Sequence, residues 1–336
     1  MWRNRERLAE QGYAFPGRPV DHFRAALDLR EIDFGGYDDP LAEGAWEPFA
    51  AEALKSARRG IVVSHEVLAA ASSEQIGTAV RSFAPADVHV VCGARDLARQ
   101  LPAVWQESLK NRRVRPYRKF LKVAFKDQPT GSPARFWVAQ DPTAVLARWG
   151  EHIPPERLHL VTVPQRRTSE DTLWRRFCTA VDLDATGFDL DVARANTSLS
   201  QPASEVLRRL NAVLPEDLDW PAYERQVKLR FNRLAERGLP GDRLTVPRRL
   251  KAQVLARSER IRAELAASPY DIVGDLDDLI PSDDAFGSVQ DPNPEVVTET
   301  AVAILAELLL EQPPRGAGAP HRARSVVHRL RRKASR

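Results

Sequence analysis

The sequence predicts an α/β fold with a doubly wound, mostly parallel sheet. Three short apolar or β-branched runs carry this prediction, because each is closed by polar residues or proline and helical stretches lie between them. The alternation of strand and helix favours right-handed crossovers within one sheet. The three runs are GIVVSHE at 60–66, DVHVVCG at 87–93 and RLHLVTVP at 157–164.

Apolar residues at helical spacing predict the helices that connect and follow these strands. After the second strand they recur from Leu97 to Leu109, so Pro102 must lie in the first turn or kink the helix. Three later stretches, 203–237, 247–267 and 295–311, have the same spacing. We therefore expect residues 203–312 to be mostly helical.

The length and composition indicate a globular protein with one large core. A chain of 336 residues can form a single α/β domain, which we place at 1–312. No stretch has eighteen consecutive apolar residues, and the start MWRNRERLAEQG is too charged for a secretory signal. Cys92 and Cys178 are the only cysteines, which argues against a disulfide scaffold. We expect a cytoplasmic protein without a transmembrane segment.

The positive charge is concentrated at the C-terminal end. Residues 315–336 contain eight Lys or Arg and no acid, whereas the net charge of the whole chain is +4. Residues 1–314 therefore carry a net charge of −4. The prediction is a basic tail at 313–336, either a solvated end or a segment that binds nucleic acid or an anionic membrane.

Polar residues gather where the predicted strands end. His65 and Glu66 close the first strand, and Arg95 and Asp96 follow the second. Ligands of doubly wound sheets bind at the carboxyl ends of the strands. Arg95 and Asp96 are therefore either a solvated pair of charges or part of an anion site at the N-terminus of the next helix.

Eight stretches together resemble the sulfotransferase superfamily, in particular the bacterial sulfotransferase family proteins. They cover most of residues 2–285 in order. The stretches are WRNRERLAEQGYAFPG, VVSHEVLAAA, VHVVCGARDLARQLPAVWQESLKNRR, AQDPTAVLARWG, RLHLVTVPQ, LWRRFC, RANTSLS and SPYDIVGDLDDLIP.

The resemblance implies a P-loop-like, three-layer α/β/α fold and 3′-phosphoadenosine-5′-phosphosulfate, PAPS, as the sulfuryl donor. Arg95 matches the arginine that holds the 3′-phosphate, a task that suits a guanidinium because it grips phosphate with two hydrogen bonds. The family has a serine eight positions later, where this chain has Ala103. Ser108 is the nearest hydroxyl and could substitute if the chain bulges at Pro102, and Gln106 and Lys110 are other possible donors.

The resemblance also implies a catalytic base near the end of the first strand. His65 stands where the cytosolic branch of the superfamily has its catalytic histidine, and an imidazole suits a base at neutral pH. Other branches use glutamate, so Glu66 is the rival. Because side chains alternate along a strand, one of the two could simply point into the core.

The chain departs from the family at its N-terminus. The family's first strand and its Lys-Thr-Gly-Thr-Thr type of loop, which binds the 5′-phosphosulfate, should precede the helix expected at residues 2–11. No GxxxxGK[ST] turn elsewhere replaces them. Two explanations stay open: a true start that lies upstream, which the retained family-like sequence of 2–11 favours, or a truncated relative, with or without activity.

The sequence thus predicts a sulfotransferase that acts on the hydroxyl or amine of an unknown small-molecule, carbohydrate or lipid acceptor. No specific nucleic-acid partner is expected, and no His, Cys and Asp cluster has the spacing of metal ligands. One alternative is a non-catalytic relative that keeps an adenosine 3′,5′-bisphosphate pocket. Another is an adaptor that acts through the basic tail.

Overall fold

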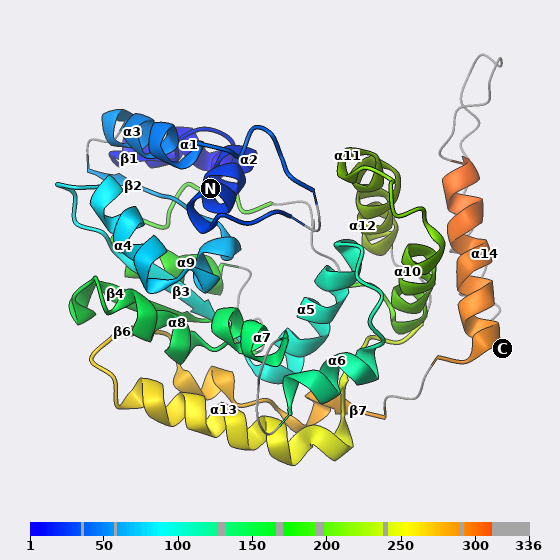
Figure 1. Cartoon of the computed structure of the whole chain (residues 1–336). Coiled ribbons are helices and arrows are strands. Elements are labelled where there is room, and N and C mark those ends of the chain that lie inside the picture. The colour runs from blue at the N-terminus through cyan, green and yellow to red at the C-terminus, as the bar shows by residue number, and fades with distance from the viewer. Residues whose placement is uncertain are drawn as a thin grey trace. The chain divides into compact units, whose positions relative to one another are not determined.

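Helices and short parallel strands alternate along the chain, and they form a mixed α/β structure that is mostly helical (Figure 1). The computed structural model describes residues 1–34, 37–56, 59–126, 132–165, 171–191, 198–237, 241–288 and 292–310. The chain divides into two compact units, which we call the sheet unit (Met1–Leu97, Lys122–Asp191 and Ala252–Asp283) and the helical unit (the remaining residues). The predicted basic tail lies outside the described residues. The single domain over 1–312 stays a prediction.

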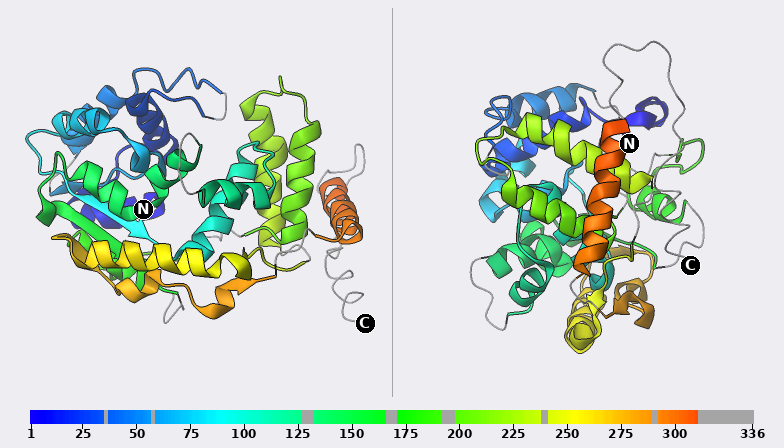
Figure 2. Two further views of the ribbon diagram at one scale, coloured as in Figure 1. Left: turned by 60° about the horizontal axis from the view of Figure 1, so that its bottom comes forward. Right: turned by 90° about the vertical axis from the view of Figure 1, so that its right-hand side faces the viewer.

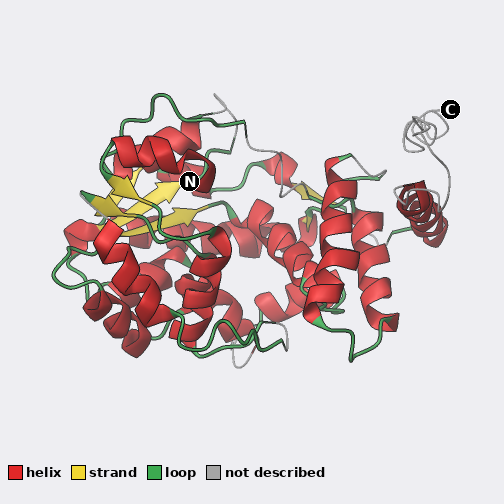
Figure 3. Ribbon diagram, turned by 90° about the horizontal axis from the view of Figure 1, so that it is seen from above, coloured by secondary structure: helices red, strands yellow, loops and turns green. Residues whose placement is uncertain are grey.

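The sheet unit contains short strands surrounded by helices (Figure 3). Its strands are β1 (Tyr13–Ala14), β2 (Gly60–Ile61), β3 (Val90–Ala94), β4 (Leu158–Thr162) and β6 (Asp271–Val273). Its α-helices are α1 (Arg5–Glu10), α2 (Pro19–Arg30), α3 (Trp46–Ser56), α4 (Ser73–Ser82), α7 (Ser132–Gln140), α8 (Pro142–Trp149), α9 (Thr172–Ala180) and most of α13 (Lys251–Ala266). Its 3₁₀ turns are η1 (Trp2–Asn4), η2 (Glu66–Ala70), η3 (Pro155–Arg157) and η6 (Leu276–Leu279).

Three parallel strands in the order β3-β4-β6 form the core of this unit. β3 runs beside β4 from the pair Val90 and Leu158 to the pair Ala94 and Thr162. All five residues of β4 are buried. Since successive side chains of a strand point to opposite faces, both faces of β4 are covered. Helix α8 contacts β3 and β4, and α9 contacts β4 and β6.

The strands predicted at 87–93 and 157–164 are confirmed as β3 and β4. The strand predicted at 60–66 is wrong beyond Ile61, because β2 pairs only with the two residues of β1. After one more hydrogen bond, from Val62 N to Ala14 O at 2.8 Å, the chain leaves the ladder. His65 and Glu66 therefore do not extend a strand but begin the 3₁₀ turn η2.

A buried carboxylate connects helix α13 to the other helices of the sheet unit. Asp141 caps the N-terminus of α8 and is 4% exposed. It accepts hydrogen bonds from Arg260 at 2.6 Å and from Arg257 at 3.4 Å. The Arg257 guanidinium also lies 3.7 Å from the ring centroid of Trp137. Although burial opposes the charge, the hydrogen bonds of Thr143 and Arg260 hold the pKa of Asp141 below its usual value.

The N-terminal helix packs on the end of α9. Leu8 is fully buried in a cluster with Cys178 and Leu183. The helix expected over residues 2–11 is observed as η1 and α1, and Gly12, which directly follows residue 11, has φ of +82°. Asn4 and Gln11 donate to the carbonyls of residues 189 and 184, each at 2.9 Å. These contacts attach the start of the chain to the loop after α9.

The helical unit has two short strands, β5 (Val246–Pro247) and β7 (Phe286–Gly287), which pair in parallel. Its helices are α5 (Leu97–Lys110), α6 (Tyr117–Ala124), α10 (Gln201–Val213), α11 (Trp220–Tyr223), a π-helical turn (Glu224–Lys228), α12 (Leu229–Glu236), a 3₁₀ turn (Arg248–Leu250) and α14 (Pro294–Leu310). The helix predicted over 203–237 is therefore interrupted after Val213, where Leu214 and Pro215 stop α10. Pro102 lies inside α5 rather than in its first turn.

Polar side chains fix α5 within the helical unit. Gln106, which is 4% exposed, donates to Leu199 O at 2.7 Å and to the Ser204 hydroxyl at 3.0 Å. Tyr223 is fully buried and donates to Asn211 Oδ1 at 2.8 Å. Because buried polar groups need partners, these contacts hold α5, α10 and α11 in one arrangement. No helix among the described residues is long and apolar enough to cross a membrane.

Candidate functional site

The candidate site residues of the sheet unit are Arg95, at the carboxyl end of β3, and the pair His65 and Glu66, which follows β2 and begins the 3₁₀ turn η2. His65 is half-buried and caps η2: its Nδ1 accepts a hydrogen bond from Val67 N at 3.2 Å. The centroid of its ring lies 4.9 Å from the ring centroid of Phe23. Glu66, the first residue of η2, is exposed.

Two arginines hold η2 in place through its backbone carbonyls. Arg30 donates to Val67 O at 3.1 Å. Arg148 donates to Ala69 O at 2.7 Å and to Ala71 O at 3.3 Å. Cations at the C-terminal end of a helical turn satisfy the carbonyls that lack partners there. These two guanidinium groups therefore position the turn that carries Glu66.

The hydrogen bond to His65 Nδ1 fixes the tautomer of the ring. Burial lowers the pKa of His65, although the charge of Glu66 opposes the shift, so the neutral ring is favoured. Since Nδ1 faces the N–H of Val67, it must be the unprotonated nitrogen, and the ring proton sits on Nε2. In this arrangement Nε2 donates a hydrogen bond and cannot accept a proton.

Arg95 directly follows β3 and is half-buried. The residue before it, Ala94, is 4% exposed, and the residue after it, Asp96, is 1% exposed. Gly93 is exposed, and no atom lies within 4 Å of the place where a Cβ would stand. The two neighbours of Arg95 in the chain are therefore buried, whereas there is open space beside Gly93.

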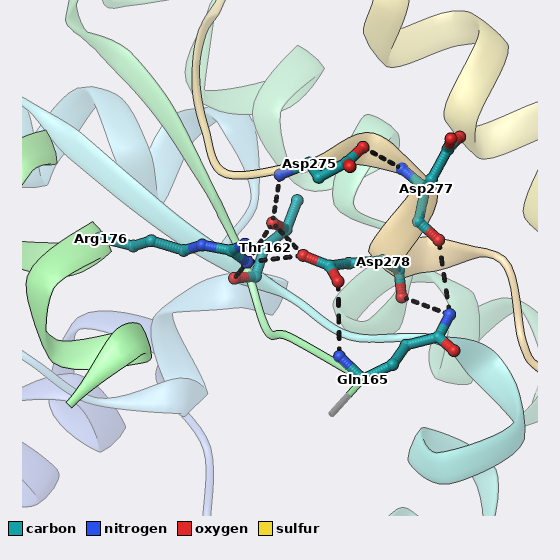
Figure 4. A network of polar contacts seen from close by, with 6 residues as sticks. All are labelled: Thr162, Gln165, Arg176, Asp275, Asp277 and Asp278. Atoms are coloured by element: carbon teal, nitrogen blue, oxygen red, sulfur yellow. Dashed lines mark hydrogen bonds and ion pairs between the residues drawn. The ribbon is translucent and has the colours of Figure 1, made fainter. Parts of the chain in front are cut away.

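A polar network joins the end of β4 to the loop after β6 (Figure 4). Thr162, the last residue of β4, is fully buried, and its hydroxyl donates to Asp278 Oδ2 at 3.1 Å. Arg176 of α9 donates to the same carboxylate oxygen at 2.6 Å and to Thr162 O at 2.8 Å. Gln165 N also donates to Asp278, at 3.4 Å. One carboxylate thus connects β4, α9 and η6.

Three of the stretches that carry the family resemblance meet in this network. Thr162 and Gln165 come from RLHLVTVPQ, Arg176 from LWRRFC, and Asp278 from SPYDIVGDLDDLIP. Sequence reasoning did not single out these residues, because each lies far along the chain from its partner. Thr162 and Asp278, for example, are 116 positions apart.

Ser108 and Lys110 belong to the helical unit, whereas Arg95 belongs to the sheet unit. The Ser108 hydroxyl donates to Trp105 O of its own helix at 2.7 Å. Lys110 is 5% exposed and lies 3.7 Å from Glu107. Burial lowers the pKa of Lys110, although the charge of Glu107 opposes the shift. Their role as phosphate donors stays a prediction.

A second polar arrangement, at the amino ends of the same strands, was missed by sequence reasoning. His89 Nδ1 lies 2.9 Å from His159 Nε2, and His159 Nδ1 lies 2.7 Å from Asp271 Oδ2. Because the Asp271 carboxylate accepts a hydrogen bond from the protonated Nδ1 of His159, Nε2 of the neutral His159 ring is the acceptor and His89 Nδ1 is the donor. The exposed ring of His89 thus keeps an unprotonated Nε2. His89 stands just before β3 rather than inside it.

Among the described residues, no group of three or more His, Cys, Asp or Glu side chains is arranged to hold a metal ion. Both cysteines are free thiols. Comparisons with family models, with curated proteins and with solved structures each found no match for this chain.

Proposed function

We propose that this chain is a sulfotransferase-family protein that uses PAPS as sulfuryl donor. The acceptor is the hydroxyl or amine of a small molecule, carbohydrate or lipid. One observation carries the proposal: Arg95 stands at the carboxyl end of β3, an edge strand of the β3-β4-β6 sheet, where ligands of parallel sheets bind.

The surroundings of Arg95 support its role as the group that binds the 3′-phosphate. The arginine is half-buried, so its charge is only partly screened by water, while the exposed Gly93 leaves room beside it. Helix α5 begins two residues later, and the first amides of a helix favour an anion. A phosphate bound by Arg95 would therefore be stabilised by the charge of the guanidinium and by the first amides of the helix.

The geometry favours Glu66 over His65 as the base. The Nε2 atom of His65 carries the ring proton, so it can only donate. Glu66 is exposed and stands at the first position of a turn held by Arg30 and Arg148. In the proposed reaction the Glu66 carboxylate takes the proton of the acceptor hydroxyl as the acceptor oxygen bonds to the sulfur of PAPS. The bond from that sulfur to the 5′-phosphate oxygen breaks, and adenosine 3′,5′-bisphosphate leaves.

Titration calorimetry with adenosine 3′,5′-bisphosphate tests the proposal. The full chain should bind this nucleotide, and Arg95→Ala should weaken binding by about tenfold or more, since a charge-assisted bidentate contact is lost. Arg95→Lys keeps the charge but not the fork, so it should fall between the two. Arg81→Ala is the matched control, because Arg81 is an exposed arginine of α4 in the same unit.

The outcomes separate the competing functions. Absence of binding by the unmodified chain would overturn the proposal, and binding that is indifferent to Arg95→Ala would remove Arg95 from the site. The sequence contains no GxxxxGK[ST] loop for the 5′-phosphosulfate. Binding of the nucleotide and transfer of the sulfuryl group from PAPS are therefore measured in separate experiments. Nucleotide binding without transfer from PAPS to any offered acceptor would favour the non-catalytic relative.

A further inference from the structure

The last ten residues of α14 expose apolar side chains to solvent. The stretch AVAILAELLL at 301–310 contains a single charged residue, Glu307. Ala303 and Ile304 lie on one side of the helix and are buried. Helix α14 contacts α10 and α12, in front of which it runs in Figure 2 (right). The opposite side carries four large apolar residues that are more than half exposed, Val302 (61%), Leu305 (56%), Leu309 (62%) and Leu310 (53%), which we call the apolar stripe.

The charge distribution of this helix is the reverse of that on an ordinary surface helix. Surface helices turn charges toward water and apolar side chains toward the core. Here Glu307 is 4% exposed, and Arg237 of the same unit donates to its carboxylate at 3.2 Å. Glu307 is the only charged residue at positions 301–310, and it is buried. The apolar stripe therefore contains no charged side chain from these positions. Contiguous exposed apolar surface of this kind marks an interaction site.

The sequence places a strong positive charge directly beyond the stripe. Leu310 is followed by four residues, and then by residues 315–336 with eight Lys or Arg and no acid. We propose that the apolar stripe binds the surface of an anionic lipid bilayer, whose negative charge complements the basic sequence of residues 315–336. This proposal does not rest on the sulfotransferase function.

Lipid is the partner that satisfies both features at once. An amphipathic helix can bury its apolar side in the interfacial layer while basic residues approach anionic headgroups, and stable attachment needs two such signals. A second copy of the chain would cover the stripe but would bring two segments of charge +8 together. Nucleic acid would neutralise the basic residues but would leave the leucines in water.

Vesicle sedimentation tests the proposal on the full chain. Vesicles of phosphatidylcholine with one quarter phosphatidylserine should bind the chain, and vesicles of phosphatidylcholine alone should bind it much more weakly. The double variant L305S/L309S should bind the anionic vesicles about tenfold less tightly, because the apolar contribution is lost. V213S/L229S is the matched control, since both residues are exposed apolar residues of the helical unit.

Each alternative gives a different result. Equal binding of L305S/L309S and the unmodified chain to anionic vesicles would overturn the proposal, because the basic segment would then act alone. A dimer in analytical ultracentrifugation that L305S/L309S dissociates, without vesicle binding, would overturn it in favour of a second copy. Binding to duplex DNA but not to vesicles would overturn it in favour of nucleic acid. Thermal unfolding of both double variants should match that of the unmodified chain, since the four substituted residues are exposed.

Discussion

His65 has two ring nitrogens, and its own chain already occupies one of them. Nδ1 accepts from Val67 N, and burial lowers the pKa of the ring, so the proton of the neutral form sits on Nε2. We expect nitrogen-15 NMR near pH 7.5 to report Nδ1 of His65 as the unprotonated nitrogen. His89 provides an internal control, because its contact with His159 predicts the opposite tautomer.

This measurement decides between the two candidate bases. If Nδ1 of His65 proves to be protonated, Nε2 is free to accept a proton, and the preference for Glu66 is wrong. If both histidines show the predicted tautomers, Glu66→Gln becomes the variant to compare with the unmodified chain in transfer assays. The variant preserves the shape of the side chain and removes its capacity as a base.

Individual site residues were predictable from the sequence only where local pattern placed them. Arg95 was recognised because it directly ends an apolar run, and the end of a parallel strand is a place for ligands. Thr162, Arg176 and Asp278 were not recognised. Their contacts depend on how distant segments meet, and no window of sequence around any one of them contains the other two.

At the scale of elements, the loop after β6 fits against β4 only because residue 274 is glycine. Gly274 has φ of +115°, and a Cβ there would stand 2.1 Å from the Thr162 hydroxyl. Gly274→Ala should therefore lower the free energy of unfolding by about 2–4 kcal/mol, from backbone strain and the displaced hydrogen bonds of Thr162. Urea denaturation followed by circular dichroism measures this change.

Gly44→Ala separates the two causes of that loss. Gly44 also has a positive φ, of +69°, but no atom lies within 4 Å of its Cβ position. It should therefore show only the strain, about 1 kcal/mol. Equal losses for the two variants would show that the network around Thr162 contributes nothing to the stability of the loop.

The elements that the sequence predicted correctly are those that a local pattern determines. β3, β4 and α13 follow from apolar runs or helical spacing within one stretch. β6 has only three residues, too few to show a pattern, and it exists because β4 offers an edge. The strand at β2 is shorter than predicted for the opposite reason: its partner β1 ends after two residues.

At the scale of the whole molecule, buried histidines make stability depend on pH. Burial lowers the pKa of His22 and His65 in the folded state, whereas the unfolded chain takes up protons near pH 6.5. Since the unfolded state binds more protons, stability should fall as the pH drops below about 6.5 toward the folded-state pKa values. Denaturation at pH 7.5, 6.5 and 5.5 measures the slope.

His22 provides the sharpest variant for this prediction. It is 1% exposed, its Nε2 lies 2.7 Å from Pro16 O, and its Nδ1 accepts from Ser64 N at 3.2 Å, so a second ring proton would face an N–H group. His22→Gln should therefore reduce the slope of stability against pH between 7.5 and 5.5. A free energy of unfolding that stays constant over this range would contradict the prediction. Carboxylates with lowered pKa, such as Asp39, act only below about pH 4.

The discontinuous make-up of the sheet unit has a consequence for protein synthesis. Its third stretch, Ala252–Asp283, is translated after residues 192–251 of the helical unit. At about 5–20 residues per second, a ribosome would release β4 on the order of ten seconds before β6. During that interval one edge of β4 has no strand beside it, and Thr162 and Arg176 lack the carboxylate that joins them. The nascent chain therefore presents an unpaired strand edge that only its own later residues can cover, and this is the stage at which a chaperone would be needed most.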